Sequence, residues 1–329
     1  GSAATLGILI KDATSLEIAN KINTVILDKT WTLTEGKPVV TDILGDILQI
    51  VASVENKSEH SLAYAIINKA KEENLELLDV KNFKAIPGHG VYAELGGKKI
   101  LFGSRKLMTL NKIDIREWEE KIINLENQGK TTMILSVDNE IMGLIAVADV
   151  LKKESIQAIK SLQENNIEVW MLTGDNKRTA EAIASEVGIK NIISEVLPHQ
   201  KAEKVRELQA QGKIVAMVGD GINDAPALTQ ADVGIAMGSG TDIAMESANI
   251  TLMRGDLMLI PETIKLSKQT MKIIKQNLFW AFFYNVAFIP VAAGVLFPFF
   301  GILLNPIFAA AAMAFSSISV VLNSLRLKK

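Results

Sequence analysis

The sequence has no cysteine and no strong charge of either sign. Without cysteine the chain cannot form a disulfide framework, a thiolate metal site or a catalytic thiol, so a soft-metal site must use methionine, histidine or oxygen. A net charge of −2 and the lack of any block rich in lysine or arginine argue against a nucleic-acid-binding protein. The 48% apolar content and mean hydropathy of +0.23 exclude a disordered chain and favour a membrane component.

Charge is missing altogether from one long segment near the C-terminus. Between Asn277 and Leu325 the sequence contains no Asp, Glu, Lys or Arg, which leaves room for two membrane spans of about 20 residues each. We predict a transmembrane helix hairpin with helices over 277–297 and 307–325; a hairpin buried in a protein core is the alternative. Helix-breaking residues separate the two spans, namely Pro298, Gly301 and Pro306.

Basic residues flank this uncharged segment on both sides. Because lysine and arginine concentrate on the cytoplasmic side of membrane helices, both ends of the hairpin are predicted to be cytoplasmic. The chain is accordingly expected to be an integral membrane protein in contact with the lipid bilayer. The flanking residues are Lys268, Lys272, Lys275, Arg326, Lys328 and Lys329.

The rest of the chain alternates short apolar segments with helical ones, an order that favours an α/β fold with a parallel sheet. The helical segments cover 153–165, 177–187 and 199–210. The apolar segments are predicted as strands: Thr24–Leu27, Ile167–Leu172, Ile214–Val218 and Val233–Ala236.

An insertion separates the first of these strands from the others and is predicted to be a second domain. It has its own helix over 58–74 and its own strand-like segments over 91–95, 99–102 and 132–137. The predicted limits are 1–22 for a stalk segment, 23–38 with 143–262 for the parallel-sheet domain, 39–142 for the insertion, and 263–329 for the stalk and hairpin.

Reactive side chains follow the predicted strands, at the edge where a parallel sheet places its site. Asp28 comes directly after the first strand, and a carboxylate there can attack a phosphoryl group and form an aspartyl phosphate. Thr173, Gly174 and Asp175 follow the second strand and offer a hydroxyl and backbone N–H groups to phosphate oxygens.

The third strand is followed by residues 219–224, where Asp220 and Asp224 supply the hard oxygen ligands that suit Mg²⁺. Lys201, on the intervening helix, offers a point charge to a transferring phosphate. Each of these residues alone is more simply explained as a turn or capping residue. Their order and spacing along one sheet favour a phosphoryl-transfer site.

These motifs resemble those of the P-type cation-transporting ATPases, in particular their copper-transporting, heavy-metal branch. The family's phosphorylation motif is similar to residues 28–34 (Asp-Lys-Thr-Trp-Thr-Leu-Thr), its second phosphate motif to 171–175 and its hinge motif to 218–226. The resemblance implies a haloacid-dehalogenase-like parallel sheet, an inserted α+β nucleotide-binding domain and a C-terminal transmembrane hairpin. It covers essentially the whole chain but only the later part of such a pump, because the family's Cys-Pro-Cys and Thr-Gly-Glu motifs have no counterpart here.

The resemblance also implies roles for individual residues. Asp28 would be the nucleophile that takes the γ-phosphoryl group of ATP, and Asp28, Thr30 and Asp220 would hold Mg²⁺. The family's catalytic positions correspond to Asp28, Lys29, Thr30, Thr173, Gly174, Asp175, Lys201, Asn223 and Asp224.

Two positions beside the nucleophile bear on activity. Phosphatases on this fold carry an Asp two residues after the nucleophile, where this chain has Thr30; a threonine cannot activate water as a carboxylate can, so the phosphoenzyme is expected to persist. The family has Gly where this chain has Trp31, whose Cβ restricts the backbone and whose ring would fill part of the phosphate cleft. We expect slow or absent phosphorylation; the alternative is a ring that points into solvent at little cost.

The insertion carries residues that resemble the branch's nucleotide-binding marks. By this resemblance the His60 ring stacks on adenine, Glu59 accepts from its exocyclic amine, and Gly88 and Gly90 let the backbone approach the nucleotide. Ser61 stands where the family usually has proline, a change expected to soften the loop.

Polar residues in the predicted spans are candidates for a copper pathway. The resemblance assigns Tyr284, Asn285, Met313 and Ser317 to it, and methionine sulfur suits Cu(I). The alternative is that these polar residues only hold two helices together.

The predicted function is the catalytic part of an ATP-driven Cu(I)-exporting ATPase of the cell membrane, with ATP, Mg²⁺ and the copper ion as its ligands. Further partners implied by the resemblance are the missing N-terminal half and a copper chaperone. Two alternatives remain open: a catalytically silent nucleotide-binding membrane fragment, and a membrane-anchored phosphatase.

Overall fold

The computed structural model describes residues 2–58, 61–220, 224–238, 242–295, 297–301 and 306–328; within these, several helix positions, including 284, 285 and 306–314, are described by their backbone alone. The chain forms two compact units. One consists of Ile22–Met258, and the other combines Gly1–Lys21 with Leu259–Lys329.

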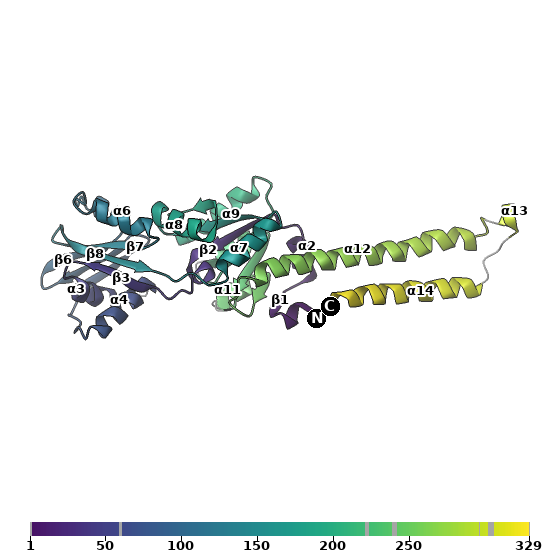
Figure 1. Ribbon diagram of the computed structural model, residues 1–329, viewed down its shortest axis with the longest axis horizontal. Helices are drawn as coiled ribbons and strands as arrows, with labels where there is room; N and C mark the ends of the chain where they lie inside the picture. The colour runs from purple at the N-terminus through teal and green to yellow at the C-terminus, as the bar shows by residue number, and fades with distance from the viewer. Residues whose placement is uncertain are drawn as a thin grey trace. The chain divides into compact units, whose positions relative to one another are not determined.

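A parallel sheet organises one half of the larger unit (Figure 1). Its strands pair in the order β13-β12-β11-β2-β9-β10, and β2, β11 and β12 are buried at every position. Such continuous burial is expected of strands that helices cover on both faces. The strands are β2 (Thr24–Asp28), β9 (Glu168–Leu172), β10 (Asn191–Ile193), β11 (Val215–Gly219), β12 (Val233–Met237) and β13 (Ile250–Leu252).

The helices of this half fall between the strands, which confirms the predicted α/β alternation. Helix α8 begins after Asn176, whose side chain accepts from the Thr179 amide, and ends at Gly188 in the left-handed region. These caps explain why α8 has the predicted bounds. The helices are α7 (Ser155–Glu164), α8 (Lys177–Val187), α9 (Lys201–Gln209), α10 (Ala225–Gln230) and α11 (Asp242–Ser247).

An antiparallel sheet with helices on each face organises the inserted half. Its strand order is β3-β8-β7-β6-β5-β4. Along β6, Ile100 and Phe102 belong to the core under α3 and α4, whereas Leu101 belongs to the core under α5 and α6. The elements are β3 (Val39–Leu44), α3 (Leu48–Glu55), α4 (Ser61–Glu72), β4 (Lys81–Ile86), β5 (Gly90–Leu95), β6 (Lys98–Gly103), α5 (Arg105–Leu110), α6 (Glu119–Asn127), β7 (Thr131–Val137) and β8 (Glu140–Ala148).

Three features of this sheet differ from the sequence prediction. Strands β3 and β4 were not predicted, since both are edge strands without a buried residue and neither has a clear apolar pattern. Strand β8 continues past residue 142, because its buried second half pairs with β3 and β7. The inserted sheet therefore extends to Ala148, and the predicted limits of the domains stay a prediction.

The smaller unit consists of α1 (Ser2–Thr5), β1 (Ile8–Ile10), α2 (Ala13–Ala19), α12 (Leu259–Ala292), α13 (Phe297–Phe300) and α14 (Pro306–Leu325). Side chains tie these helices together. The Ser267 hydroxyl on α12 donates to the Leu16 carbonyl on α2. Asn323 on α14 donates to Asn277 on α12 at 2.8 Å.

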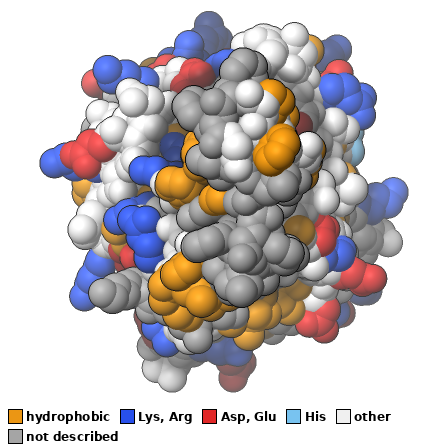
Figure 2. Space-filling model, turned by 90° about the vertical axis from the view of Figure 1, so that its right-hand side faces the viewer, with side chains coloured by type: hydrophobic (Ala, Val, Ile, Leu, Met, Phe, Trp, Pro, Cys, Tyr) orange, Lys and Arg blue, Asp and Glu red, His pale blue; other side chains and the backbone are white. Residues whose placement is uncertain are grey.

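The helix pair α12 and α14 occupies the segment where the sequence predicted two spans (Figure 1). Helix α12 continues through Pro290 and stops at Ala292, five residues before the predicted end; Gly294, which follows, adopts φ 87°, a conformation that no right-handed helix continues. Figure 2, which views the molecule from the side on which this pair lies in Figure 1, shows hydrophobic side chains in orange on that face. Within the described ranges, no helix is both long enough and apolar enough to cross a membrane.

Candidate active site

Carboxylates from two neighbouring strand ends meet in one buried cluster. Asp28 ends β2, Asp220 follows β11, and the pairing of Leu27 with Val218 aligns these two ends. Asp224 joins them at the start of α10. Oxygens of the three carboxylates lie within 4.8 Å of one another, and all three residues are buried. The predicted convergence of Asp28, Asp220 and Asp224 is what the structure shows.

One lysine bridges this cluster. The Lys201 Nζ donates to Asp28 Oδ1 at 2.6 Å and to Asp224 Oδ1 at 2.7 Å. Burial acts to lower the pKa of Lys201, but the two carboxylates outweigh it and raise that pKa above its usual range. Lys201 is therefore held as a cation.

A single lysine leaves the cluster with excess negative charge. Burial raises the pKa of Asp28 to about 6, with Asp224 adding to the effect. Burial, followed by the charges of Asp28 and Asp224, raises the pKa of Asp220 to about 7. Buried, closely spaced carboxylate oxygens with uncompensated charge fit a hard divalent cation such as Mg²⁺.

A second ion pair lies beside the cluster. Lys29 Nζ is 2.5 Å from Asp175 Oδ2, and Asp175 also accepts from the hydroxyls of Thr131 and Thr173, each at 3.0 Å. Burial opposes ionisation of Asp175, but the Lys29 charge lowers its pKa below the usual value. Lys29, Thr173 and Asp175 thus bind one another, and Gly174 lies between the last two. Thr131 belongs to β7, so this contact also joins the two sheets of the larger unit.

The loop after Asp28 adopts an unusual backbone. Trp31 has φ 61° and ψ −12°, which is the left-handed region that glycine adopts without strain. Its indole ring covers Gly36 so closely that a Cβ there would overlap it, yet 39% of Trp31 stays exposed. Lys152 Nζ donates to the Trp31 carbonyl at 2.7 Å and to the Gly255 carbonyl at 3.1 Å.

The expected strain at Trp31 is therefore present, and the ring packs on the chain while keeping an exposed face. The sequence did not predict that Lys152 and Gly36 contact Trp31. Neither is part of a recognisable motif, and only the folded loop brings them to Trp31.

The predicted nucleotide-binding residues are described in part. Glu59 and His60 lie outside the described residues. Gly88 and Gly90 have φ 72° and 141°. A Cβ on Gly90 would overlap the Phe102 carbonyl oxygen, so the sheet itself requires a glycine there.

Glu55 is a buried acid that the sequence analysis overlooked. It ends α3, three residues before Ser58, and burial raises the pKa of its carboxyl although Ser58 donates to it. Its Oε2 atom has no hydrogen-bond partner in the described part of the chain. Glu55 follows the buried Val54 but precedes the exposed Asn56 and Lys57, so no local sequence pattern marks it as buried.

The predicted copper ligands lie on the two long helices. Tyr284 and Asn285 fall within α12 and Met313 within α14, but their side chains lie outside the described residues. Ser317 lies on α14 and is exposed.

Comparisons with known proteins give similarities of three kinds. Residues 22–232 match the haloacid dehalogenase-like hydrolase family. Two copper-exporting P-type ATPases, from Staphylococcus saprophyticus and Staphylococcus epidermidis, are 53% and 54% identical to the whole chain over 41% of their own length. The chain therefore spans less than half the length of these curated relatives.

Two solved structures of ATPases are also similar to this chain. A zinc-transporting PIB-type ATPase in its E2.Pi state superposes with a TM-score of 0.72 at 34% identity, covering 100% of this chain and 53% of its own. The catalytic domain of the CPx-ATPase CopB-B superposes with a TM-score of 0.65 at 31% identity, covering 80% of this chain and 96% of its own.

The excess charge of the cluster predicts how stability depends on pH without divalent cations. Because the pKa of Asp220 is about 7 in the folded chain against an ordinary 3.8, the folded state holds more protons between these values, and stability falls as pH rises from about 4 to 7. We expect Asp220→Asn to weaken this fall and to stabilise the chain at pH 7 by about 1–2 kcal/mol, roughly 2–8 °C in the unfolding midpoint.

Thermal unfolding in EDTA at pH 5 and pH 7 measures this. Asp46→Asn is the matched control, since Asp46 is exposed. Equal pH dependence of the native chain and Asp220→Asn would contradict the assignment.

Proposed function

The chain belongs to the haloacid dehalogenase-like hydrolases and, within them, to the heavy-metal P-type ATPases, and on this premise we propose that it is the catalytic part of a copper-exporting ATPase. The observation that carries the proposal is the buried cluster of Asp28, Asp220 and Asp224 bridged by Lys201. It combines a nucleophile, candidate metal ligands and a fixed cation in one place.

In the proposed reaction an Asp28 carboxylate oxygen attacks the γ-phosphorus of ATP. The new bond joins that oxygen to phosphorus, the bond between the γ-phosphorus and the bridging oxygen breaks, and ADP leaves with that oxygen. Lys201, already 2.6 Å from Asp28, neutralises charge on the phosphoryl oxygens. Thr173 and Gly174 would hold those oxygens from the other side.

Magnesium would be held by Asp28, Asp220 and Thr30, with Asp224 beside them, and would offset the charge of the phosphates. Asn223, a further predicted site residue, lies outside the described residues. Magnesium bound there would also offset the excess negative charge of the cluster. Lys29 and Asp175 then fix the loops that carry Asp28 and Thr173, because their ion pair spans both.

Thr30 favours a long-lived phosphoenzyme over a phosphatase. The second position after the nucleophile holds no carboxylate to activate water, so hydrolysis of the aspartyl phosphate has no general base there. A persistent intermediate is what a transport cycle needs in order to couple phosphorylation to a conformational change.

ATP would reach this site from the inserted domain. We assign the adenine side to Glu59 and His60 and the backbone approach to Gly88 and Gly90. Glu55 lies four residues before Glu59, and we include it as a further acceptor for the adenine amine because one oxygen of its carboxyl has no partner among the described residues.

Transport belongs to the smaller unit in this proposal. Residues 277–325 contain no Asp, Glu, Lys or Arg, which supports a membrane hairpin with cytoplasmic ends in the cell membrane. Tyr284, Asn285, Met313 and Ser317 would contribute to a Cu(I) pathway. The lipid bilayer, the rest of the pump and a copper chaperone are the partners that this role implies.

Phosphorylation by radiolabelled ATP with Mg²⁺ tests the central step. We expect Asp28→Asn to remove an acid-stable label completely, because an amide is a far poorer nucleophile than a carboxylate. Asp46→Asn is the control and should keep the label. Label that survives in Asp28→Asn would disprove the assignment, and release of phosphate from small phosphoesters without ATP would favour the phosphatase.

The backbone conformation of Trp31 leads us to expect slow formation of the phosphoenzyme. Its left-handed backbone costs about 1–2 kcal/mol in a residue with a Cβ, and a shift of about 1 Å in the reacting atoms costs on the order of a hundredfold in rate. We expect Trp31→Gly to form the phosphoenzyme at least tenfold faster in rapid-quench measurements. Equal rates in both chains would show that the indole does not affect attack.

Glu55 predicts a defect confined to nucleotide binding. An amide in place of its carboxyl presents a donor toward the adenine amine, so we expect Glu55→Gln to weaken ATP binding by about tenfold. Isothermal titration with a nonhydrolysable ATP analogue measures this, and Glu76→Gln is the control on an exposed residue. Unchanged affinity in Glu55→Gln would exclude the contact.

A further inference from the structure

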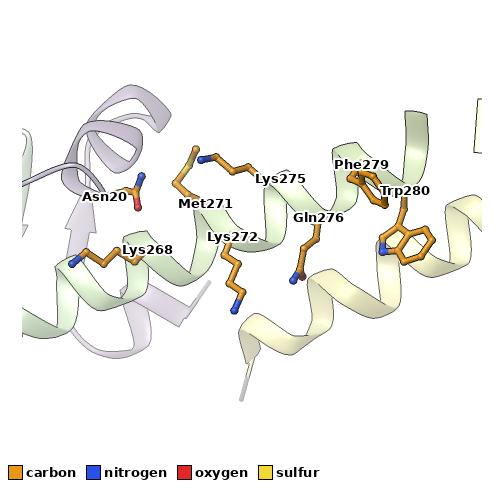
Figure 3. A pocket seen from close by; sticks show the side chains of 8 residues that line it. All are labelled: Asn20, Lys268, Met271, Lys272, Lys275, Gln276, Phe279 and Trp280. Atoms are coloured by element: carbon orange, nitrogen blue, oxygen red, sulfur yellow. The ribbon is translucent and has the colours of Figure 1, made fainter. Parts of the chain in front are cut away.

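A cavity of about 490 Å³ lies in the smaller unit, between the end of α2 and the side of α12. Figure 3 shows Lys268, Lys272 and Lys275 projecting from α12 around it, with Trp280 farther along the same helix. Asn20, which caps the end of α2, lines the other side. This cavity is separate from the carboxylate cluster and has no part in the proposed phosphoryl transfer.

The cavity is strongly positive. Its lysines are spaced by four and three residues, which places them along one face of the helix. No acidic residue lines it, and none of its lysines forms an ion pair within the described ranges of the chain. Like charges gathered without a counter-ion favour an anionic ligand.

Hydrogen bonds hold the walls of the cavity in place. Gln276, which lines it, accepts from Asn323 on α14 at 3.2 Å, and Asn323 also donates to Asn277 at 2.8 Å. The contact from Ser267 to Leu16 fixes α2 against α12. A ligand would therefore meet a formed cavity and would not have to assemble it.

The position of the cavity along the chain indicates the source of the anion. Lys275 is the last charged residue before the uncharged stretch that begins at Asn277. Phe279 and Trp280 come next and pack edge to face with centroids 5.5 Å apart. Lysines followed by an aromatic pair and an uncharged helix are typical of the level at which lipid headgroups lie.

We propose that this cavity binds the phosphate-bearing headgroup of an anionic membrane lipid, with Lys268, Lys272 and Lys275 around the phosphate and Trp280 beside the start of the acyl chains. The inference rests on the proposed membrane hairpin. It adds a lipid-binding site to the role of the smaller unit.

Native mass spectrometry of the full 329-residue chain in detergent with phosphatidylglycerol or phosphatidylcholine tests this. We expect a bound phosphatidylglycerol that survives detergent removal, and about fivefold weaker retention in Lys272→Gln, the effect of roughly 1 kcal/mol for one lysine near an anionic surface. Lys265→Gln is the matched control, because Lys265 lies on the same exposed helix surface but does not line the cavity. Equal retention of the two lipids, or equal loss in both variants, would overturn the proposal.

Two further experiments distinguish a lipid headgroup from a soluble anion, and a failure of the lipid site from a failure of the membrane hairpin. Displacement of the lipid by excess inorganic phosphate, with the same dependence on Lys272, would show that the cavity takes a soluble anion and would overturn the lipid assignment. Alkaline extraction of membranes reports on the hairpin itself. A chain that stays in the membrane but does not prefer phosphatidylglycerol disproves only the lipid site, whereas a chain that is extracted disproves the hairpin on which it rests.

Discussion

The bridge from Lys201 to Asp28 and Asp224 is the interaction on which the candidate site depends. It places one cation between carboxylates that their mutual repulsion would otherwise keep apart. Removing one member of such a buried group typically costs about 3–5 kcal/mol, because the remaining charge has no partner. The bridge requires that the ends of β2 and β11 are in register and that α9 begins at Lys201. The order of the strands in the parallel sheet therefore determines which charged groups meet in the cluster.

The two lysines of the site bind different carboxylates. Lys201 pairs with Asp28, the proposed nucleophile, and with Asp224, whereas Lys29 pairs with Asp175. Asp175 in turn accepts from Thr131 of the inserted sheet. Lys29, which follows Asp28, is therefore part of a connection between the two halves of the larger unit. A change in that connection would reach Asp28 through a single peptide bond, and in the proposed function it would link nucleotide binding to phosphorylation.

The elements that sequence analysis predicted are those whose signal is local. The buried parallel strand Thr24–Asp28 contains the apolar run Val25–Leu27. Helix α8 is capped by Asn176 at its start and by Gly188 at its end, and both residues are recognisable in the sequence. The convergence of Asp28, Asp220 and Asp224 followed from strand order alone. Edge strands β3 and β4, the buried acid Glu55 and the contact of Lys152 with Trp31 were missed, because each depends on partners far away in the chain.

Trp31 shows how tertiary contacts decide a backbone that the residue itself disfavours. The loop between β2 and the Thr34 bridge to Leu151 turns within a few residues, and its left-handed backbone angle falls at Trp31. Lys152 holds the carbonyl of that residue, and Gly36 leaves room for the ring. Contacts of the folded chain thus hold the backbone of Trp31 in this conformation, and its side chain packs accordingly. The architecture of this site is therefore compatible with a residue that, in the proposed function, would alter the attack on ATP.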